Sequence, residues 1–523
     1  MRFDPARTTT ATNDVAVAFA DGIPSLSIID DPTERALFSA DIAGPAAATA
    51  DAILQPQNSE EVEAIVAIAR REGCALYPRG GGWSYSGGYG PSRTPAAIVD
   101  TGRLRAMTVA KDAGRVTIGA GVTWARLFES LDAAGLRVPS FGPLSGIGAT
   151  VGGLVAQNGG FFGAAGCGPI ADESLCASTV IAGSGERITL TRDHRADGSA
   201  APQPLAGDCG AFGLRVDVTL QAIARPATTA FASFAFAEGE EALAALRSLA
   251  GVPGLGEVFI FDPGTHANLA RSGFSLAERT ALAGDLMAAR AGALRGIADV
   301  VRAARWSNAR IADIPWSLHV SLDGDAAATR AGLADVVGRA QACGGNAIPD
   351  VIPRVTRARP FRRIKALLGP DGELWLATHG VFTLEAAARG FQATKALLAD
   401  RAAVMRGHGI RATMLIVLMR DRIVIEPQLF WADSLSPLHR RLCPSDQVAA
   451  YGGRTERPAA RAAVHELRRD LIAAMDAAGA AHFQIGRTYA AHPGVSEQAR
   501  RAWTSWKKRL DPDRIMNPGV LGL

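Results

Sequence analysis

A glycine-rich stretch at residues 77–91, YPRGGGWSYSGGYGP, most constrains how this chain can fold. Gly80, Gly81 and Gly82 follow a short apolar run and Arg79. Glycine allows positive φ and close approach of another molecule, because no Cβ stands in the way. Successive main-chain N–H groups in a turn form a concave anion site, and Arg79 adds a fixed positive charge beside it. The stretch therefore predicts either a diphosphate-binding loop or a glycine-rich surface loop.

The segments before this loop predict a helix and then a strand. Asn58 can cap a helix over residues 59–72, Glu61 can complete a capping box, and Gly73 ends the apolar periodicity. The run CALYP then predicts a short strand. A Rossmann unit has the order strand, glycine loop, helix, with the glycines opening the helix. The order found here disfavours an NAD-dependent dehydrogenase.

A second glycine-rich stretch occupies residues 138–175, between other strand-like runs. Strands are expected at residues 96–100, 115–124 and 211–223, with a hairpin that turns at Ser184-Gly185 and a short helix at residues 125–135. Two glycine-rich stretches so placed could hold two portions of one extended ligand.

The remaining segments indicate an α+β organisation. Residues 1–45 read as irregular, and a basic helix precedes the last residues of the chain. Between residues 226 and 480 the expected strands are FASFAFA, VFIFD, WSLHVSLD, ELWLATHGVF and ATMLIVLMRDRIVIEPQLFW, and the expected helices span 238–250, 276–305, 325–343, 385–408 and 458–479.

Composition narrows the class of protein. With 523 residues, 48% of them hydrophobic, the chain can form two or more domains with a large core. Its 55 basic residues lie scattered among 51 acidic ones, which indicates no nucleic-acid face. The six cysteines show no metal, haem or disulfide spacing, so we expect no metal site and a reducing, cytoplasmic setting. No apolar leader and no membrane span are expected.

Several segments together resemble the flavoprotein family of vanillyl-alcohol oxidase and p-cresol methylhydroxylase, and also the FAD-linked 2-hydroxy-acid dehydrogenases. The resemblance covers roughly residues 46–225, parts of the middle and the last part of the chain. The matching segments are Pro56-Gln57-Asn58, Arg79 to Ser84, GAGVTWARL, Gly148 to Gly153, Asp172 to Gly185, Gly213-Leu214 and DPDRIMNPG.

The resemblance implies an α+β fold in which FAD lies between two subdomains under a cap. It suggests an N-terminal extension over 1–45, an FAD-binding domain over 46–225, a cap (substrate) domain over 226–483, and a C-terminal segment, 484–523, that completes the FAD domain. The residues it assigns to the cofactor are Arg79, Gly80, Gly81, Gly82, Trp83, Ser84, Pro143, Gly148, Thr150, Gly153, Gly213, Val216, His379 and Asn517.

The resemblance also raises the question of how FAD is attached. Some relatives carry a histidine at the position of Trp83 and bind FAD covalently through it, which an indole cannot do. Other relatives use a cysteine near the position of Pro143, where this chain has none. A third route uses a cap-domain histidine, and His379 stands in a similar context. His379 is therefore predicted to be a covalent anchor or another flavin contact, and the alternative is a histidine of the core.

For catalysis, the resemblance points to hydride transfer from a substrate C–H to flavin N5, with Arg487, Tyr89 and Tyr85 orienting the substrate oxygen. This chain departs from the phenol-oxidising relatives in having Gly486 where they carry a tyrosine and Gln157 where they carry an acidic base. An aromatic, phenolic or bulky alcohol is the favoured substrate.

Two alternatives remain open: an FAD-linked dehydrogenase of 2-hydroxy acids such as lactate or glycolate, and a non-catalytic binding protein on the same scaffold. The electron acceptor would be O₂ or a separate carrier, and a homodimer is compatible with the family.

Overall fold

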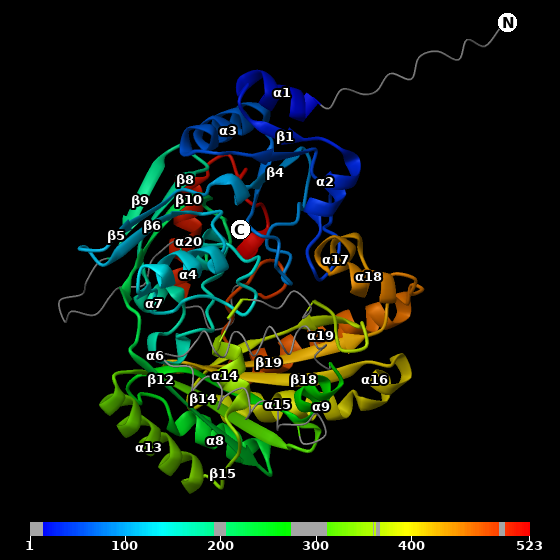
Figure 1. Cartoon of the computed structure of the whole chain (residues 1–523). Helices are drawn as coiled ribbons and strands as arrows, with labels where there is room; N and C mark the ends of the chain where they lie inside the picture. The colour runs from blue at the N-terminus through cyan, green and yellow to red at the C-terminus, as the bar shows by residue number, and fades with distance from the viewer. Residues whose placement is uncertain (1–13, 193–205, 273–310, 359, 362–366, 491–496) are drawn as a thin grey trace, which may run out of the picture.

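The computed structural model describes residues 14–192, 206–272, 311–358, 360–361, 367–490 and 497–523. Its elements gather in two lobes, which lie one above the other in Figure 1. The upper lobe contains two larger sheets and a two-stranded pair, all from the first half of the chain, with the C-terminal segment packed against them, and the lower lobe contains one large sheet. The expected α+β fold class is confirmed.

The first sheet of the upper lobe has the strand order β1-β2-β4-β3. Its strands are β1 (Ser27–Ile29), β2 (Ala52–Gln55), β3 (Ala75–Arg79) and β4 (Ala96–Asp100). The strand β4 runs parallel to both β2 and β3, whereas β1 is antiparallel to β2. The expectation of an irregular start is wrong, because α1 (Asp14–Gly22), β1 and α2 (Pro32–Ser39) are ordered elements of this lobe.

The helix expected before the glycine loop is α3 (Ser59–Glu72). The Asn58 side chain accepts the Glu61 N–H at 2.8 Å, and Gly73 ends the helix with a φ of 63°. The capping box differs from expectation, because the Glu61 carboxylate accepts the Gln57 N–H at 2.8 Å and the Ser25 hydroxyl at 2.8 Å. The Glu61 carboxylate therefore holds residues that precede the helix cap. The helix α3 is followed directly by β3 and the glycine loop.

The second sheet of the upper lobe is antiparallel, in the order β5-β6-β10-β8-β9. Its strands are β5 (Met107–Ala110), β6 (Arg115–Gly119), β8 (Leu175–Ala182), β9 (Arg187–Thr191) and β10 (Gly213–Gln221). The predicted strand over 115–124 stops at Gly119, because α4 (Trp124–Ala133) begins with Thr123 as its cap. Shorter elements of this lobe are η1 (Thr101–Arg103), α5 (Val151–Gln157), α6 (Ala164–Cys167) and α7 (Ile170–Glu173), with β7 (Leu136–Arg137) pairing with β11 (Ile223–Ala224).

The lower lobe is an antiparallel sheet in the order β15-β12-β14-β13-β18-β19-β16, with β17 also paired to β19. Its strands are β12 (Thr228–Phe236), β13 (Leu255–Phe261), β14 (Trp316–Gly324), β15 (Asn346–Ala347), β16 (Leu374–Ala377), β17 (Gly380–Thr383), β18 (Arg411–Met419) and β19 (Arg422–Trp431). The accompanying helices are α8 (Gly239–Ser248), α9 (Pro263–Arg271), α13 (Ala326–Ala342), α14 (Val351–Ala358), α15 (Ala387–Asp400), α16 (Ala402–His408), α17 (Pro437–Leu442), α18 (Ser445–Tyr451) and α19 (Pro458–Ala477).

The expected helix over 385–408 is thus two helices that meet at Arg401, and the one expected over 276–305 lies outside the described residues.

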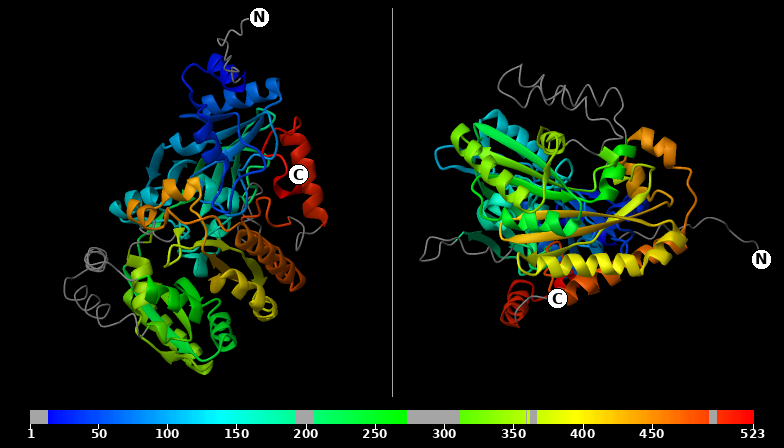
Figure 2. Two further views of the ribbon diagram at one scale, coloured as in Figure 1. Left: turned by 90° about the vertical axis from the view of Figure 1, so that its right-hand side faces the viewer. Right: turned by 90° about the horizontal axis from the view of Figure 1, so that it is seen from below.

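The two faces of this large sheet have different neighbours. Alternate residues of β18 point to opposite faces: Ile416 and Leu418 share a core with α8, α13, α15 and α19, whereas Leu415 and Val417 share a core with Trp124 and other residues of the upper lobe. The helix α6 packs on β13 and β18 at this second face. Figure 2 shows the helical layer on the side away from the upper lobe. The lobes therefore share one continuous hydrophobic core.

A buried ion-pair network also joins the lobes. The Asp323 carboxylate accepts from Arg137 of the upper lobe at 2.7 Å and from Arg357 at 2.7 Å. Arg357 also bonds to Glu257 at 3.0 Å, and Glu257 accepts the Gly163 N–H at 2.9 Å. Burial alone raises the pKa of Asp323, but the two guanidinium groups and their hydrogen bonds outweigh burial and hold this pKa below its usual value.

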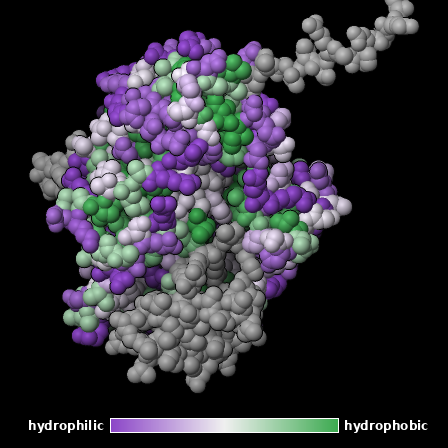
Figure 3. Space-filling model, turned by 45° about the horizontal axis from the view of Figure 1, so that its top comes forward, coloured by the Kyte–Doolittle hydropathy of each residue, from purple (hydrophilic) through white to green (hydrophobic). Residues whose placement is uncertain are grey.

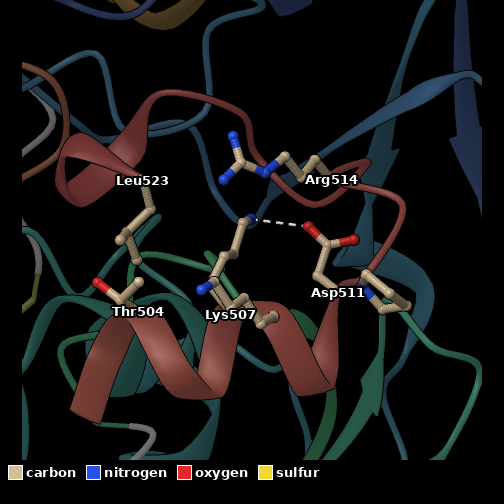
Figure 4. Close-up of a pocket in the computed structure, with 7 residues that line it drawn as sticks. Thr504, Lys507, Asp511, Arg514 and Leu523 are labelled. Atoms are coloured by element: carbon tan, nitrogen blue, oxygen red, sulfur yellow. Dashed lines mark ion pairs between the residues drawn. The ribbon is translucent and has the colours of Figure 1, made fainter. Parts of the chain in front are cut away.

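The C-terminal segment returns to the first sheet. The basic helix expected there is α20 (Glu497–Leu510), and Met516 forms a parallel bridge with Leu76 of β3. The buried Lys507 ammonium pairs with Asp511 at 2.7 Å (Figure 4). It also donates to the carbonyls of Ala211 and Met516. A surface cavity of about 140 Å³ beside this pair is lined by α20 and the chain end. Lys507 thus fastens the tail to the upper lobe.

No helix among the described residues is long and apolar enough to cross a membrane. On the face seen in Figure 3, hydrophilic residues cover most of the upper lobe, with apolar residues scattered among them.

We predict that Asp323→Asn lowers the free energy of unfolding by about 3 kcal/mol, because two buried guanidinium groups lose their shared carboxylate. Urea unfolding at neutral pH measures the change. The control Asp335→Asn removes an exposed ion pair with Arg339 and should cost no more than about 0.5 kcal/mol. Because the pKa of Asp323 is depressed, the difference between wild type and Asp323→Asn should persist above the pKa of an ordinary aspartate and shrink as the pH falls through the depressed value. Equal losses in the two variants would contradict the role of the network.

Candidate functional site

The two glycine-rich stretches meet in space, and their joint hold on one ligand stays a prediction. A Cβ on Gly81 would lie 1.7 Å from the carbonyl oxygen of Gly148, and one on Gly148 would lie 1.8 Å from Nε1 of Trp83. A Cβ on Gly80 would lie 2.3 Å from Oγ1 of Thr150. At Gly81 the obstacle is the Gly148 backbone, so the two backbones approach each other as closely as glycine allows, whereas at Gly80 and Gly148 it is a side chain of the other stretch.

Arg79 ends β3 at the start of this loop, and its side chain is only 9% exposed. The guanidinium lies 4.3 Å from the ring centre of Phe38 and 5.4 Å from that of Tyr89. Its Nε atom is buried without a hydrogen-bond partner, and no carboxylate among the described residues pairs with it. A buried cation without a counter-ion destabilises a protein. An anionic ligand such as a diphosphate would neutralise it, so these residues fit FAD.

Residues 40–42 of the N-terminal segment, which was predicted to be irregular, are hydrogen-bonded to the glycine loop. The Asp41 carboxylate accepts the Gly87 N–H at 2.7 Å, and Ile42 N–H donates to the Ser84 carbonyl at 3.0 Å. The Tyr89 hydroxyl donates toward the carbonyls of Ala40 at 2.9 Å and Gly82 at 3.0 Å. Burial raises the pKa of Asp41 to about 6 against the opposing effect of its N–H donors. These hydrogen bonds therefore stabilise the conformation of the loop, and no sequence motif predicted them.

Arg487 and Asn517 fasten the other side of the same loop. Arg487 donates to the Gly87 carbonyl at 2.6 Å, to Oδ1 of Asn517 at 2.6 Å and to the Pro518 carbonyl at 2.8 Å. The fully buried Asn517 donates to the carbonyls of Gly88 and Cys209, each at 2.7 Å. Nη1 and Nη2 of Arg487 and the Tyr89 hydroxyl thus bond within the protein, whereas Nε of Arg487 is buried without a partner. The catalytic role of both residues stays a prediction.

The remaining residues assigned to the cofactor lie in the upper lobe. Thr150 caps α5 by accepting the Gly153 N–H at 3.2 Å, and Pro143 accepts the Gly146 N–H at 3.0 Å. In β10, Gly213 pairs with Ala182 of β8, where a Cβ would lie 2.4 Å from the Ile181 carbonyl, and the Val216 carbonyl accepts the Ala120 N–H at 2.9 Å. Contact of these residues with FAD remains a prediction.

His379 lies between β16 and β17 with both ring nitrogens engaged. Its Nε2 is 2.7 Å from the Phe483 carbonyl oxygen, and its Nδ1 is 3.1 Å from the Tyr489 hydroxyl. Since a carbonyl only accepts, Nε2 carries the hydrogen and Nδ1 accepts from Tyr489. Burial and the neighbouring His482 lower the pKa of His379 to about 3, so the ring is neutral. A covalent bond to FAD would require one of these hydrogen bonds to break.

One group of side chains points from the two lobes toward a shared region. Tyr85 of the glycine loop packs on Trp375 of β16, with ring centres 5.0 Å apart. Glu426 and Gln428 project from the face of β19 that looks toward the upper lobe, and Gln428 Nε2 donates to Glu426 at 2.9 Å. Burial, followed by the carboxylates of Glu426 and Asp41, raises the pKa of Tyr85. Tyr85 was predicted from the sequence and Glu426 was not; the only signal of Glu426 was a carboxylate between the apolar residues of β19.

Comparisons with known proteins agree with this geometry. Residues 50–191 match the family model of the FAD binding domain. D-lactate dehydrogenase of Archaeoglobus fulgidus is 36% identical over 120 residues, which are 23% of this chain and 26% of that protein. The chain thus spans about a quarter of the length of this curated relative.

Two solved structures resemble the whole chain. p-Cresol methylhydroxylase with substrate bound has a TM-score of 0.68 at 13% identity, over 98% of this chain and 96% of that one. 4-Ethylphenol oxidase from Gulosibacter chungangensis, in its isoeugenol complex, has a TM-score of 0.65 at 16% identity, over 100% of this chain and 99% of that one. Residues 50–191 are therefore an FAD binding domain, the chain has the fold of p-cresol methylhydroxylase, and the prediction of FAD as its cofactor is confirmed.

We predict that Gly81→Ala weakens FAD binding about 10- to 100-fold, because the methyl group displaces the Gly148 backbone and overpacking of this kind costs about 1–3 kcal/mol. Equilibrium dialysis, with FAD followed by its visible absorbance, measures the affinity. Gly338→Ala in α13 is the matched control, because a Cβ there meets no atom within 4 Å. Equal FAD affinities of the two variants would contradict binding of FAD by the glycine loop.

We also predict that FAD is released when the protein is denatured in acid, because both nitrogens of His379 are already engaged. The measurement compares FAD in the supernatant with FAD in the precipitate. A fluorescent polypeptide band on a denaturing gel would show covalent attachment and contradict this outcome.

Proposed function

We propose that the chain, whose residues 50–191 form an FAD binding domain, is an FAD-dependent oxidoreductase acting on the C–H of an aromatic or bulky alcohol. The observation that carries the proposal is the buried, unpaired Arg79 beside a glycine loop that admits no side chain. A loop that only covered the surface would have no reason to bury an uncompensated cation at its base. A non-catalytic FAD-binding protein would need the same glycine loop and Arg79, so catalytic activity is the property to be tested.

FAD supplies the acceptor for a hydride from the substrate carbon. The protein's own part is to bind, orient and desolvate. The backbone around Gly80–Gly82 with Arg79 would hold the diphosphate, and Tyr85 and Trp375 would form part of the wall against which the organic part of the substrate packs. The electrons would then pass to O₂ or to a separate carrier.

The contacts of the arginines support an uncharged substrate. A 2-hydroxy acid requires a guanidinium free to bind its carboxylate in a bidentate pair. The Nη groups of Arg487 bond to main-chain carbonyls and Asn517, Nη2 of Arg468 donates to the Tyr85 carbonyl at 2.7 Å, and Arg411 pairs with Glu373; only Nε of Arg487 and of Arg468 is buried without a partner. This favours an alcohol over a hydroxy acid.

Oxidation of a 2-hydroxy acid is the second candidate, and the identity of part of the chain with a D-lactate dehydrogenase favours it. It requires Arg487 or another arginine to leave its present partners when substrate binds. A homodimer, and division of the chain into an FAD domain over 46–225 and a cap over 226–483 with flanking terminal segments, also remain proposals.

We predict that the purified protein carries FAD and that anaerobic addition of an aromatic alcohol bleaches its visible absorbance, whereas D-lactate does so at least about tenfold more slowly. Stopped-flow absorbance with matched concentrations of both compounds measures the two rates. Faster bleaching by D-lactate would favour the second candidate. A protein that binds FAD and is bleached by no alcohol or hydroxy acid of a broad panel would be the non-catalytic alternative.

A further inference from the structure

We propose that Glu426 accepts the hydroxyl proton of the substrate alcohol, opposite Tyr85, and that this pair selects uncharged alcohols over hydroxy acids. The inference rests on the proposed function and names the proton acceptor and the substrate class of that same site.

The placement of Glu426 follows from the register of β19. Ile423, Ile425 and Leu429 point into the core beneath the helices, whereas Val424 faces the upper lobe. Glu426 and Gln428 share the Val424 face because side chains alternate along a strand. Glu426 therefore faces the upper lobe from β19, a strand paired on both sides, with Gln428 as its polar neighbour on the same face.

Two polar groups here have unused hydrogen-bonding capacity. The Glu426 carboxylate receives one hydrogen bond, from Gln428, and the Tyr85 hydroxyl receives none from any described residue. Both residues are half-buried, and no oxygen of either is a buried atom without a partner. In contrast, the hydroxyls of Tyr89 and Tyr489 are hydrogen-bonded within the protein. The Tyr85 hydroxyl and the Glu426 carboxylate are therefore open to a bound molecule, and a substrate hydroxyl would bond to both, accepting from Tyr85 and donating to Glu426.

The charges around Glu426 suit proton transfer. Burial raises the pKa of Glu426 against the opposing hydrogen bond from Gln428. The titratable groups that face it are Tyr85 on the glycine loop and Tyr489 on the C-terminal segment, and both tyrosine pKa values are raised first by burial and also by the Glu426 charge. Arg468 of α19 donates to the Tyr85 main chain and lies over the Tyr489 ring. A carboxylate with a raised pKa is a stronger base than an ordinary glutamate.

The step balances with FAD as the oxidant. The substrate O–H and C–H bonds break and a carbonyl C=O bond forms. The hydroxyl hydrogen moves as a proton to a Glu426 carboxylate oxygen, the carbon-bound hydrogen leaves with its electron pair to FAD, and the acid returns its proton to solvent. The charges of Glu426 and Asp41 both raise the pKa of Tyr85, so both lie near its hydroxyl. A substrate carboxylate bound there would be repelled by these two like charges.

The experiment compares FAD-loaded wild type with Glu426→Gln, using 4-methoxybenzyl alcohol and mandelate as probes. Rates of anaerobic flavin bleaching are measured between about pH 5 and 9. The wild-type rate with the alcohol should rise with pH and level off above the raised pKa of Glu426, whereas Glu426→Gln should be about 100-fold slower and lack this rise. Mandelate, scored by the change it causes in the flavin spectrum, should bind Glu426→Gln more tightly than wild type, because one like charge is gone.

A stability measurement shows whether the variant folds and tests the placement without activity. A glutamate whose folded-state pKa is raised loses stability as the pH rises through that value. The melting temperature of Glu426→Gln relative to wild type should therefore increase with pH, at unchanged FAD content. The exposed Glu385→Gln is the matched control and should follow wild type in both measurements.

The inference is overturned if Glu426→Gln keeps the wild-type rate and pH profile, or if wild type is bleached by mandelate and not by the alcohol; in both cases the oxidoreductase function stands. Absence of bleaching with a broad panel of alcohols and hydroxy acids would overturn the proposed function together with the inference.

Discussion

The structure depends on a backbone contact, that between the glycine loop after β3 and the second glycine stretch before α5. At Gly81 and Gly148 the contact leaves no room for even one methyl group. It positions the main chain beside Arg79, whose buried charge has no carboxylate partner among the described residues. This supports the proposal that the loop binds an anion that the chain itself does not provide. Asp41, Arg487 and Asn517 hold the loop through hydrogen bonds to its main chain.

The lower lobe holds its large sheet rigidly against the upper lobe, and in the proposed function this sheet forms a wall of the site. One face of its sheet packs on its own helices, and the other completes the core of the upper lobe. The Arg137–Asp323–Arg357 network fixes how the lobes sit, and both guanidinium groups also lie about 5 Å from the Phe141 ring. A sheet held in this way can keep Glu426 and Trp375 at a constant position opposite Tyr85.

Much of this could be predicted from the sequence, because the signals were local. The cap at Asn58, the β8–β9 hairpin and the long apolar strands of the lower lobe follow from residue pattern alone, and the glycine loop followed from its composition. The partners of the loop could not be predicted. Asp41 and Arg487 reach it from distant parts of the chain through hydrogen bonds to main-chain groups. Such contacts depend on no particular residue type in the loop, so no motif or residue spacing in the sequence indicates them. The position of Glu426 became interpretable only when the register of β19 showed which face it shares.

The segment that returns to β3 has a consequence for the order of folding. The Leu76 N–H donates to the Ile515 carbonyl, and the Asn517 N–H donates to the Leu76 carbonyl, so the strand that leads into the glycine loop is completed by residues far away in the sequence. Asn517 also donates to the Gly88 carbonyl of the loop itself. Contacts between residues so far apart carry a large loop-closure entropy and form late in folding. The loop therefore reaches its final geometry only after these two distant parts of the chain have come together.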